Sequence, residues 1–175
     1  MRLALVLLLI SATANAADAI DFSVKQMGVA VNGGFKRFTA RIDLDPAHLD
    51  KSSAEITVDV ASVSTGIEEG DQTAIDKAWL DVAEFPKATF KSTAVRSLAG
   101  DRYEAKGLLT IRGKARDISV PFTAKNEAHG STVVTGDFTI RRTDFGIGGG
   151  EWNQGDLVAD EVPIHFRLTL NKDSQ

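Results

Sequence analysis

The sequence predicts an all-β fold: an eight-stranded antiparallel barrel with one short helix capping an end. Eight segments alternate apolar and polar residues with a period of two, which is typical of strands with one buried face. Polar or glycine-containing turns separate most of these segments, as in antiparallel hairpins. Strands of this regularity build either a two-sheet sandwich or a closed up-and-down barrel, and a barrel of eight strands is wide enough to hold one small ligand.

The N-terminus has the composition of a secretory signal peptide. Arg2 precedes an apolar run over residues 3–10, and Ala14-Asn15-Ala16 fits the small-x-small rule for signal peptidase, with cleavage after Ala16. A membrane anchor is the alternative, but the apolar run has about half of the roughly 20 residues that a spanning helix needs. We therefore expect residues 17–175 to be exported and to form one domain.

The composition excludes several classes of function. The chain has 20 basic and 24 acidic residues, so nothing in its charge attracts nucleic acid or an anionic membrane surface. It has no cysteine, which excludes disulfides, thiolate catalysis and cysteine-ligated metals. No segment after residue 16 is apolar and long enough to span a bilayer, so an integral membrane protein is not expected.

Three strands are expected before the helix. A turn at Asn32-Gly33-Gly34 follows the first strand, and Pro46 ends the second. The apolar faces of the three strands carry Ile20, Phe22 and Val24, then Phe38, Ala40, Ile42 and Leu44, and then Ile56, Val58 and Val60.

The predicted helix covers residues 72–82. Its four apolar residues, of which Trp79 and Val82 are the last two, are spaced by three, one and three positions. This spacing places them on one helical face. Pro86 disfavours helical backbone at Phe85 and so ends the helix. The preceding residues 65–71 are rich in glycine and acids and predict a loop. Its acids, Glu68, Glu69 and Asp71, could bind calcium weakly, but without an ordered ligand pattern a solvated loop is favoured.

Five strands follow the helix. They cover residues 87–96, 103–111, 118–122, 134–140 and 162–170, with a glycine-rich loop over residues 144–155 before the last. The turns are Ala99-Gly100-Asp101, Arg112-Gly113-Lys114 and His129-Gly130-Ser131. Pro121 and Pro163 fit inside strands only at bulges, strand starts or edge positions. The small residues expected to face inward, Ala88, Ala94, Ala105, Gly107 and Gly136, either leave space for a ligand or serve the tapering corners of a barrel.

Several motifs resemble the YceI-like family over nearly all of residues 17–175. They are Phe90-Lys91-Ser92-Thr93 after Phe85-Pro86, Gly107-Leu108-Leu109-Thr110-Ile111-Arg112-Gly113, Arg142-Thr143-Asp144-Phe145-Gly146, and Phe22-Ser23-Val24-Lys25 with Gly34-Phe35. The resemblance implies a lipocalin-like barrel in the periplasm that encloses a polyisoprenoid chain such as a quinone tail, and it implies no catalytic activity. The sequence departs from the family at Gln26, where a histidine is frequent, and at residues 68–72, where an Arg-Asp-x-His-Leu run is usual.

The candidate ligand site is the apolar wall of the barrel. Its predicted residues are Phe22, Val24, Phe38, Ile42, Val58, Trp79, Phe85, Phe90, Leu109, Phe122, Phe138, Ile140, Trp152, Ile164 and Phe166. Most of these residues could instead simply fill the barrel. Trp79 and Phe85 either cap a barrel mouth or fasten the helix to the rim. Trp152 lies either in a mobile flap over the ligand or in a plain connection.

The function favoured by the sequence is a periplasmic binding or carrier protein for an isoprenoid or quinone-type lipid, without catalytic residues, metal or other cofactor. A homodimer is compatible with this function. The alternatives are a lipid-modifying enzyme, which would need an inward polar pair, and a non-binding structural or stress module of the cell envelope, which would have a filled core. We expect His48, His129 and His165 to be solvated because none has metal-ligand spacing. Arg142 and Asp144 are expected to pair at the base of the glycine-rich loop.

Overall fold

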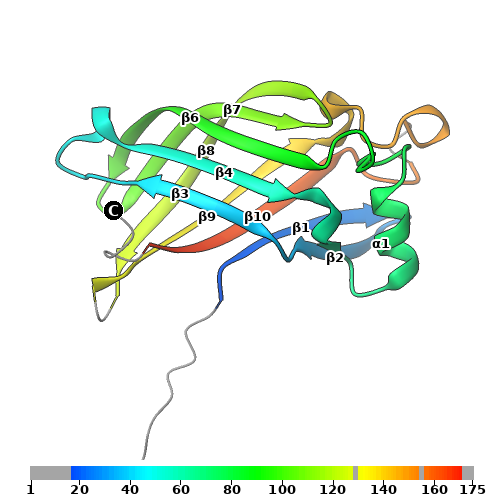
Figure 1. The fold of residues 1–175 in the computed structure, drawn as a ribbon, viewed down its shortest axis with the longest axis horizontal. Coiled ribbons are helices and arrows are strands. Elements are labelled where there is room, and N and C mark those ends of the chain that lie inside the picture. The colour runs from blue at the N-terminus through cyan, green and yellow to red at the C-terminus, as the bar shows by residue number, and fades with distance from the viewer. Residues whose placement is uncertain (1–16, 128–129, 154–155, 171–175) are drawn as a thin grey trace, which may run out of the picture.

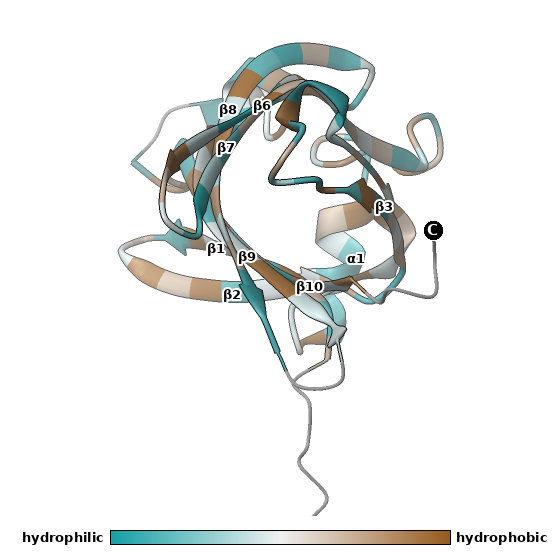
Figure 2. Ribbon diagram, turned by 90° about the vertical axis from the view of Figure 1, so that its left-hand side faces the viewer, coloured by the Kyte–Doolittle hydropathy of each residue, from teal (hydrophilic) through white to brown (hydrophobic). Residues whose placement is uncertain are grey.

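The computed structural model describes residues 17–127, 130–153 and 156–170 (Figure 1). Ten strands of this part of the chain form one antiparallel sheet in the order β3-β4-β6-β7-β8-β9-β10-β1-β2-β5. Seen end-on, the sheet curls round a central axis, with helix α1 at the far end (Figure 2). The predicted all-β antiparallel class is confirmed, with ten strands in place of eight. The predicted signal peptide, residues 1–16, and His129 lie outside the described residues.

The strands are β1 (Ala19–Gln26), β2 (Val29–Phe35), β3 (Phe38–Asp43), β4 (Ser53–Asp59), β5 (Val63–Ser64), β6 (Lys87–Ala99), β7 (Arg102–Ile111), β8 (Lys114–Asn126), β9 (Thr132–Arg141) and β10 (Glu161–Leu170). The helix is α1 (Glu68–Ile75), and short 3₁₀ turns are η1 (Leu49–Lys51), η2 (Val60–Ser62), η4 (Arg142–Phe145) and η5 (Gly150–Asn153). No helix within the described residues has the length and apolar character needed to cross a membrane.

The additional strand β2 overturns the predicted turn at Asn32-Gly33-Gly34. The turn between β1 and β2 lies instead at Met27 and Gly28, whose φ angles are 48° and 80°. Gly33 pairs with Phe22 of β1, and a Cβ at Gly33 would lie 2.5 Å from the Phe22 ring. This glycine therefore makes room for an aromatic ring across the strand pair, which explains why a turn-like sequence continues a strand.

The predicted helix over residues 72–82 is also wrong in its bounds. Helix α1 begins at Glu68 in the predicted loop, because its first turn carries three acids that interact favourably with the helix dipole. It ends at Ile75, since Asp76 has extended backbone and Asp81 has a φ of 50°. Phe85 follows a series of turns, so Pro86 does not end a helix here.

A bulge in β6 changes which of its residues face the barrel interior. The register with β7 shifts between Ser92 and Ala94, and Val95 then pairs with Ala105. Val95 lines the interior, whereas Ala94 is exposed. The prediction that Ala94 faces inward is therefore wrong, because period-two counting cannot detect an extra residue.

Pro121 and Pro163 lie inside strands, each at a point where its strand loses the pairing with one of its two neighbours. Strand β9 pairs with β8 only from Phe122 onward, next to Pro121. Strand β1 pairs with β10 only from Ile164 onward, next to Pro163. Their edge-like positions confirm the expectation that these prolines do not interrupt a fully paired strand.

Candidate functional site

The inward faces of the strands enclose an apolar cavity with a volume of about 140 Å³. It extends from the middle of the barrel to the end that carries the β3–β4 turn. Asp43, Ser53 and Thr89 are its polar lining residues. The apolar lining consists of Ile20, Ile42, Leu44, Ala54, Ile56, Val58, Ala88, Phe90, Val95, Ala105, Leu109, Val120, Phe122, Val134, Phe138, Ile164, Phe166 and Leu168. A wall of this composition offers van der Waals contact and almost no hydrogen bonding.

The aromatic residues of this wall are only half-buried although they face inward. Phe90, Phe122, Phe138 and Phe166 all keep part of their surface accessible. A packed core would bury such side chains almost completely, because protein interiors leave few voids larger than a water molecule. The barrel interior is therefore an accessible cavity at this end and not a filled core.

The inward glycines do not create this space. A Cβ at Gly136 would lie 2.5 Å from the ring of Phe166, and one at Gly107 would lie 2.7 Å from the ring of Phe90. Each glycine thus has an aromatic ring lying over it, as cross-strand aromatic residues do at strand glycines. The small residues Ala88 and Ala105 do line the cavity, so they are the ones that leave room.

The cavity includes eight of the predicted wall residues and excludes seven. Those that line it are Ile42, Val58, Phe90, Leu109, Phe122, Phe138, Ile164 and Phe166. Those that do not are Phe22, Val24, Phe38, Trp79, Phe85, Ile140 and Trp152. Phe22 lies instead along a second groove of about 750 Å³ with a mixed lining, together with Asp21 and His165. The sequence alternation would also have found the lining residues Ile20, Ile56, Val120, Val134 and Leu168, whereas Val95 depends on the bulge.

The opposite end of the barrel is closed by a hydrophobic plug. Phe145 of η4 is 2% exposed and packs with Leu109 and Ile140. Strands β8 and β9 pair only over Phe122–Asn126, and η4 contacts both strands beyond that region. The plug fills the space where these two strands diverge, so the cavity ends inside the barrel.

Arg142 holds this closed end together. Arg142 is only 1% exposed. Its guanidinium donates hydrogen bonds of 2.6–3.1 Å to the backbone oxygens of residues 147, 148, 152, 158 and 159. Its predicted pairing with Asp144 is wrong; the acid at the base of the loop is Asp160, which accepts a 2.8 Å hydrogen bond from Arg141. Because one buried guanidinium satisfies so many carbonyls, the glycine-rich loop is tied down over the barrel end.

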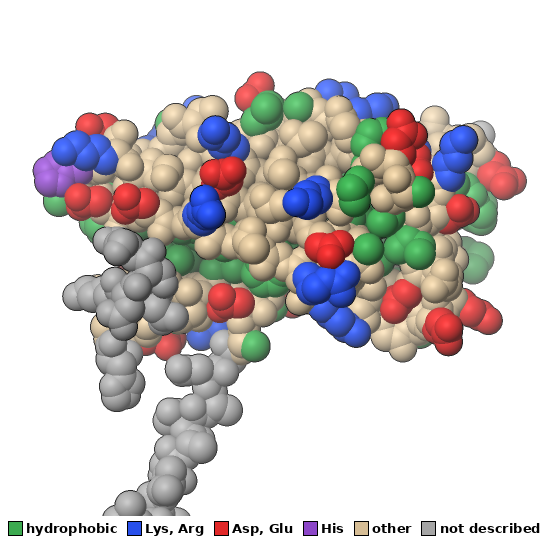
Figure 3. Space-filling view, in the orientation of Figure 1, with side chains coloured by type: hydrophobic (Ala, Val, Ile, Leu, Met, Phe, Trp, Pro, Cys, Tyr) green, Lys and Arg blue, Asp and Glu red, His purple; other side chains and the backbone are tan. Residues whose placement is uncertain are grey.

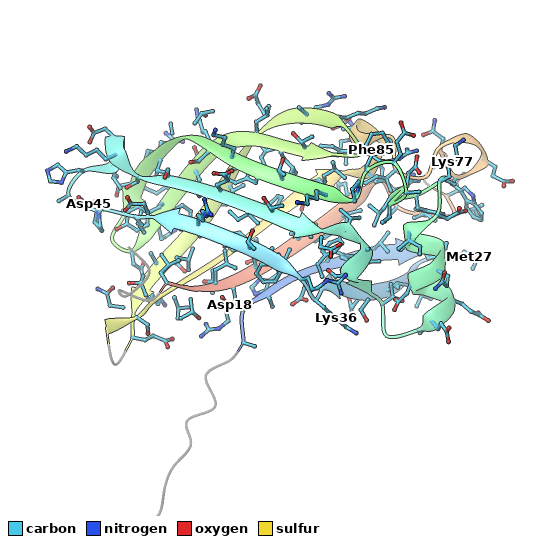
Figure 4. The ribbon with its side chains drawn as sticks, in the orientation of Figure 1. Asp18, Met27, Lys36, Asp45, Lys77 and Phe85 are labelled. Atoms are coloured by element: carbon cyan, nitrogen blue, oxygen red, sulfur yellow. The ribbon has the colours of Figure 1, made fainter. Side chains whose placement is uncertain are left out.

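The aromatic residues near the helix fasten this end and lie outside the cavity. The rings of Trp79 and Trp152 are 6.0 Å apart, and the Arg142 guanidinium lies 5.9 Å from the Trp79 ring. Phe85 and Lys77 occupy the same end of the molecule (Figure 4). Phe85 lies under the β7–β8 turn, where a Cβ at Gly113 would be 2.8 Å from its ring. The geometry favours the fastening role over the capping of a ligand.

The charged side chains described by the structure lie mostly outside this cavity, and some of them form ion pairs. His48 contacts Asp45 at 2.9 Å and His165 contacts Asp137 at 2.7 Å, and both histidines are exposed. Hydrogen bonds from the backbone and hydroxyl of Thr65 hold the pKa of Asp71 below its usual value. Within residues 17–127, 130–153 and 156–170, no group of three or more His, Asp or Glu side chains could hold a metal ion.

Comparisons with known proteins agree with this architecture. A family model described as the YceI-like domain matches residues 12–170. A UPF0312 protein of Pseudomonas savastanoi pv. phaseolicola is 31% identical over 136 residues, which cover 74% of this chain and 71% of that protein. The crystal structure of Burkholderia cenocepacia BcnA is similar with a TM-score of 0.85 and 37% identity, covering 88% of this chain and 96% of the other.

A more distant structure carries a description of its ligand. A polyisoprenoid binding domain from Saccharophagus degradans, implicated in plant cell wall breakdown, is similar with a TM-score of 0.67. It is 17% identical and the match covers 87% of this chain and 92% of the other, so the likeness is one of fold. The extent of the family match and the identity to the Pseudomonas protein show that this chain belongs to the YceI-like domain family.

Proposed function

We propose that this member of the YceI-like family binds the hydrocarbon tail of a polyisoprenoid lipid, of the quinone type, inside its barrel and carries or holds that lipid in the periplasm. The observation that carries the proposal is the apolar, accessible cavity at one end of a barrel whose other end is plugged. A ligand for such a site must be slender and must have a long segment without polar groups. Isoprenoid chains meet both conditions.

The composition of the wall supports binding through many weak contacts. Burial of hydrocarbon contributes about 0.8 kcal/mol per CH₂ group, so a chain of several isoprene units can bind tightly without any hydrogen bond. A dry cavity of about 150 Å³ with aliphatic and aromatic walls is known to accept a guest as small as benzene. The cavity found here is similar in size, at about 140 Å³, and continues to an open end, so a chain can extend beyond it.

The same wall argues against catalysis. General acid–base chemistry needs a titratable side chain within hydrogen-bond reach of the reacting group, usually with a second group that orients it. Among the described residues, the lining contains one carboxylate, Asp43, on the rim strand β3, and no histidine, lysine or arginine. We therefore propose a binding protein in preference to a lipid-modifying enzyme.

The experiment that tests this function is identification of the bound lipid. The full-length chain would be expressed in a bacterium, released from the periplasm by osmotic shock and purified without detergent. Organic extraction and mass spectrometry should then recover a polyprenyl species in near-stoichiometric amount. Absence of lipid, together with no uptake of added isoprenoid quinone by protein refolded from denaturant, would refute the proposal and favour a structural module. Sequencing of the N-terminus would test cleavage after Ala16.

A further inference from the structure

The barrel is not closed along one side. Strand β3 is the first in the sheet order and pairs with β4 alone. On the other side, β1 pairs with β10 only over residues 164–167. Beyond this pairing the amide of Thr169 donates to the Asp18 carboxylate at 2.8 Å, and residues 168–170 of β10 have no strand partner on this side. We call the gap between β3 (Phe38–Asp43) and the strip formed by residues 19–20 of β1 and 168–170 of β10 the seam. Figure 1 shows β3 separated from these strands along this side of the molecule.

The seam opens onto the cavity. Ile42 and Leu44 on the β3 side line the same cavity as Ile20 and Leu168 on the opposite side. Ala40 is exposed although it belongs to the apolar face of β3. Figure 3 shows hydrophobic side chains in the middle of this face, below β3 and above the lower strands. Apolar surface is therefore accessible from the side of the barrel as well as from its end.

The sheet is held together beside one end of the seam, where β2 continues into β3 and also pairs with β5. There, the amide of Lys36 donates to the Ser62 carbonyl at 3.1 Å, and the amide of Asp59 donates to the Arg37 carbonyl at 3.0 Å. No backbone hydrogen bond in the described residues joins β3 to β1 or β10. Strand β4 stays paired with β6, so only the outer edge, β3, is held on one side alone. The edge of β3 can move away from β1 and β10 by bending of the sheet, without breaking a strand pair that spans the seam.

We propose that the isoprenoid tail enters and leaves the cavity sideways through the seam, while its polar head group stays in solvent. This inference rests on the proposed function. The plug at Phe145 blocks passage through one end, and the wall has almost no groups that could replace the hydration of a head group drawn inside. Burial of a polar group without hydrogen bonds is costly, so a path that keeps the head outside throughout is favoured. The ligands admitted are thus single-chain isoprenoid amphiphiles whose heads can be bulky.

The absence of native cysteine allows a direct test. The double variant Ala40→Cys/Ala19→Cys places one thiol on each edge of the seam. A flexible bis-maleimide with a cleavable disulfide spacer would link them in the folded, lipid-free protein. The matched control is Lys91→Cys/Leu108→Cys, two exposed positions that already face each other across β6 and β7. Stopped-flow fluorescence would measure association and dissociation of a farnesyl or geranylgeranyl chain that carries a bulky fluorescent head.

Linking the seam should slow both association and dissociation by roughly tenfold or more, as expected when a gating motion is blocked. Cleavage of the spacer should restore both rates, and the control link should leave them unchanged. Unchanged rates in a seam-linked protein that still binds the probe with full stoichiometry would overturn sideways entry while leaving the binding function intact. Failure of the unlinked protein to bind the probe at all would instead refute the proposed function, and with it this inference.

Discussion

Filling the cavity with a protein side chain should abolish most lipid binding without unfolding the barrel. Ala105 is the suitable position, because it is 5% exposed, lines the cavity and lies opposite Val95 at the bulge. A benzene-sized group occupies a cavity of about 150 Å³, so the ring introduced by Ala105→Phe would take up most of the 140 Å³ found here.

The expected loss of affinity follows from the hydrocarbon displaced. If the new ring excludes one five-carbon isoprene unit, the complex loses roughly 4 kcal/mol at about 0.8 kcal/mol per carbon. That loss corresponds to an approximately thousandfold weaker Kd. The free energy of unfolding should change by less than about 3 kcal/mol, the usual upper range for overpacking, because the ring enters existing space.

The assay is an equilibrium titration of lipid-free protein with a fluorescent isoprenoid, paired with urea denaturation. The matched control is Ala94→Phe, since Ala94 lies on the adjacent strand and is exposed; it should change neither Kd nor stability by more than about 0.5 kcal/mol. A folded Ala105→Phe variant with wild-type affinity would show that the tail does not bind in the cavity. Equal losses in both variants would also refute the reasoning, because only one ring enters the cavity.

Three further predictions concern the parts that support the site. Replacement Arg142→Lys should lower the free energy of unfolding by roughly 3 kcal/mol or more in a denaturant titration, because several buried carbonyls lose donors worth about 1–3 kcal/mol each; a loss below 1 kcal/mol would contradict the role given to Arg142. The variant Gly136→Ala should destabilise the barrel by about 1–3 kcal/mol and displace the Phe166 ring, observed as shifted aromatic resonances in NMR spectra, because its Cβ would lie 2.5 Å from that ring. Burial alone would raise the pKa of Asp160, but hydrogen bonds from Thr143 and a neighbouring arginine outweigh it and lower that pKa below its ordinary value of 3.8. The stabilisation by Asp160 is therefore fully present above pH 3.8 and is lost as the pH falls through the lowered pKa, so the melting temperatures of wild type and Asp160→Asn should differ at neutral pH and converge in acid.

The strands after the helix could be predicted well because one physical pattern controls them. In β7, β9 and β10 each second side chain meets the barrel interior, so period-two alternation identifies lining residues such as Leu109, Phe138 and Phe166 directly. Single-residue bulges defeat this counting, as Val95 shows. Turn signals fail where a glycine serves packing: Gly33 receives the Phe22 ring and so belongs to a strand.

The closed end and the seam could not be predicted, because both depend on contacts between segments far apart in the sequence. Nothing near Arg142 indicates that its guanidinium will meet carbonyls up to residue 159. As large aromatic residues, Trp79 and Trp152 are predicted ligand contacts, but in the structure their rings contact each other beyond the plug. The alternation of apolar and polar residues also does not show whether the sheet closes into a barrel, because the edge strand β3 has the same sequence pattern as a strand paired on both sides.

The measurement that tests the central claim most directly is photoaffinity mapping of the bound tail. A farnesyl chain with a diazirine near its terminal unit would be bound to lipid-free protein, activated by light, and located by tandem mass spectrometry of proteolytic peptides. If the tail lies in the cavity, the label should appear on inward residues of β6, β7 and β10 such as Phe90, Leu109 and Ile164. Excess unlabelled isoprenoid should remove that signal. Specific labelling confined to the outer faces of the strands, or to Trp79 and Trp152, would contradict the account.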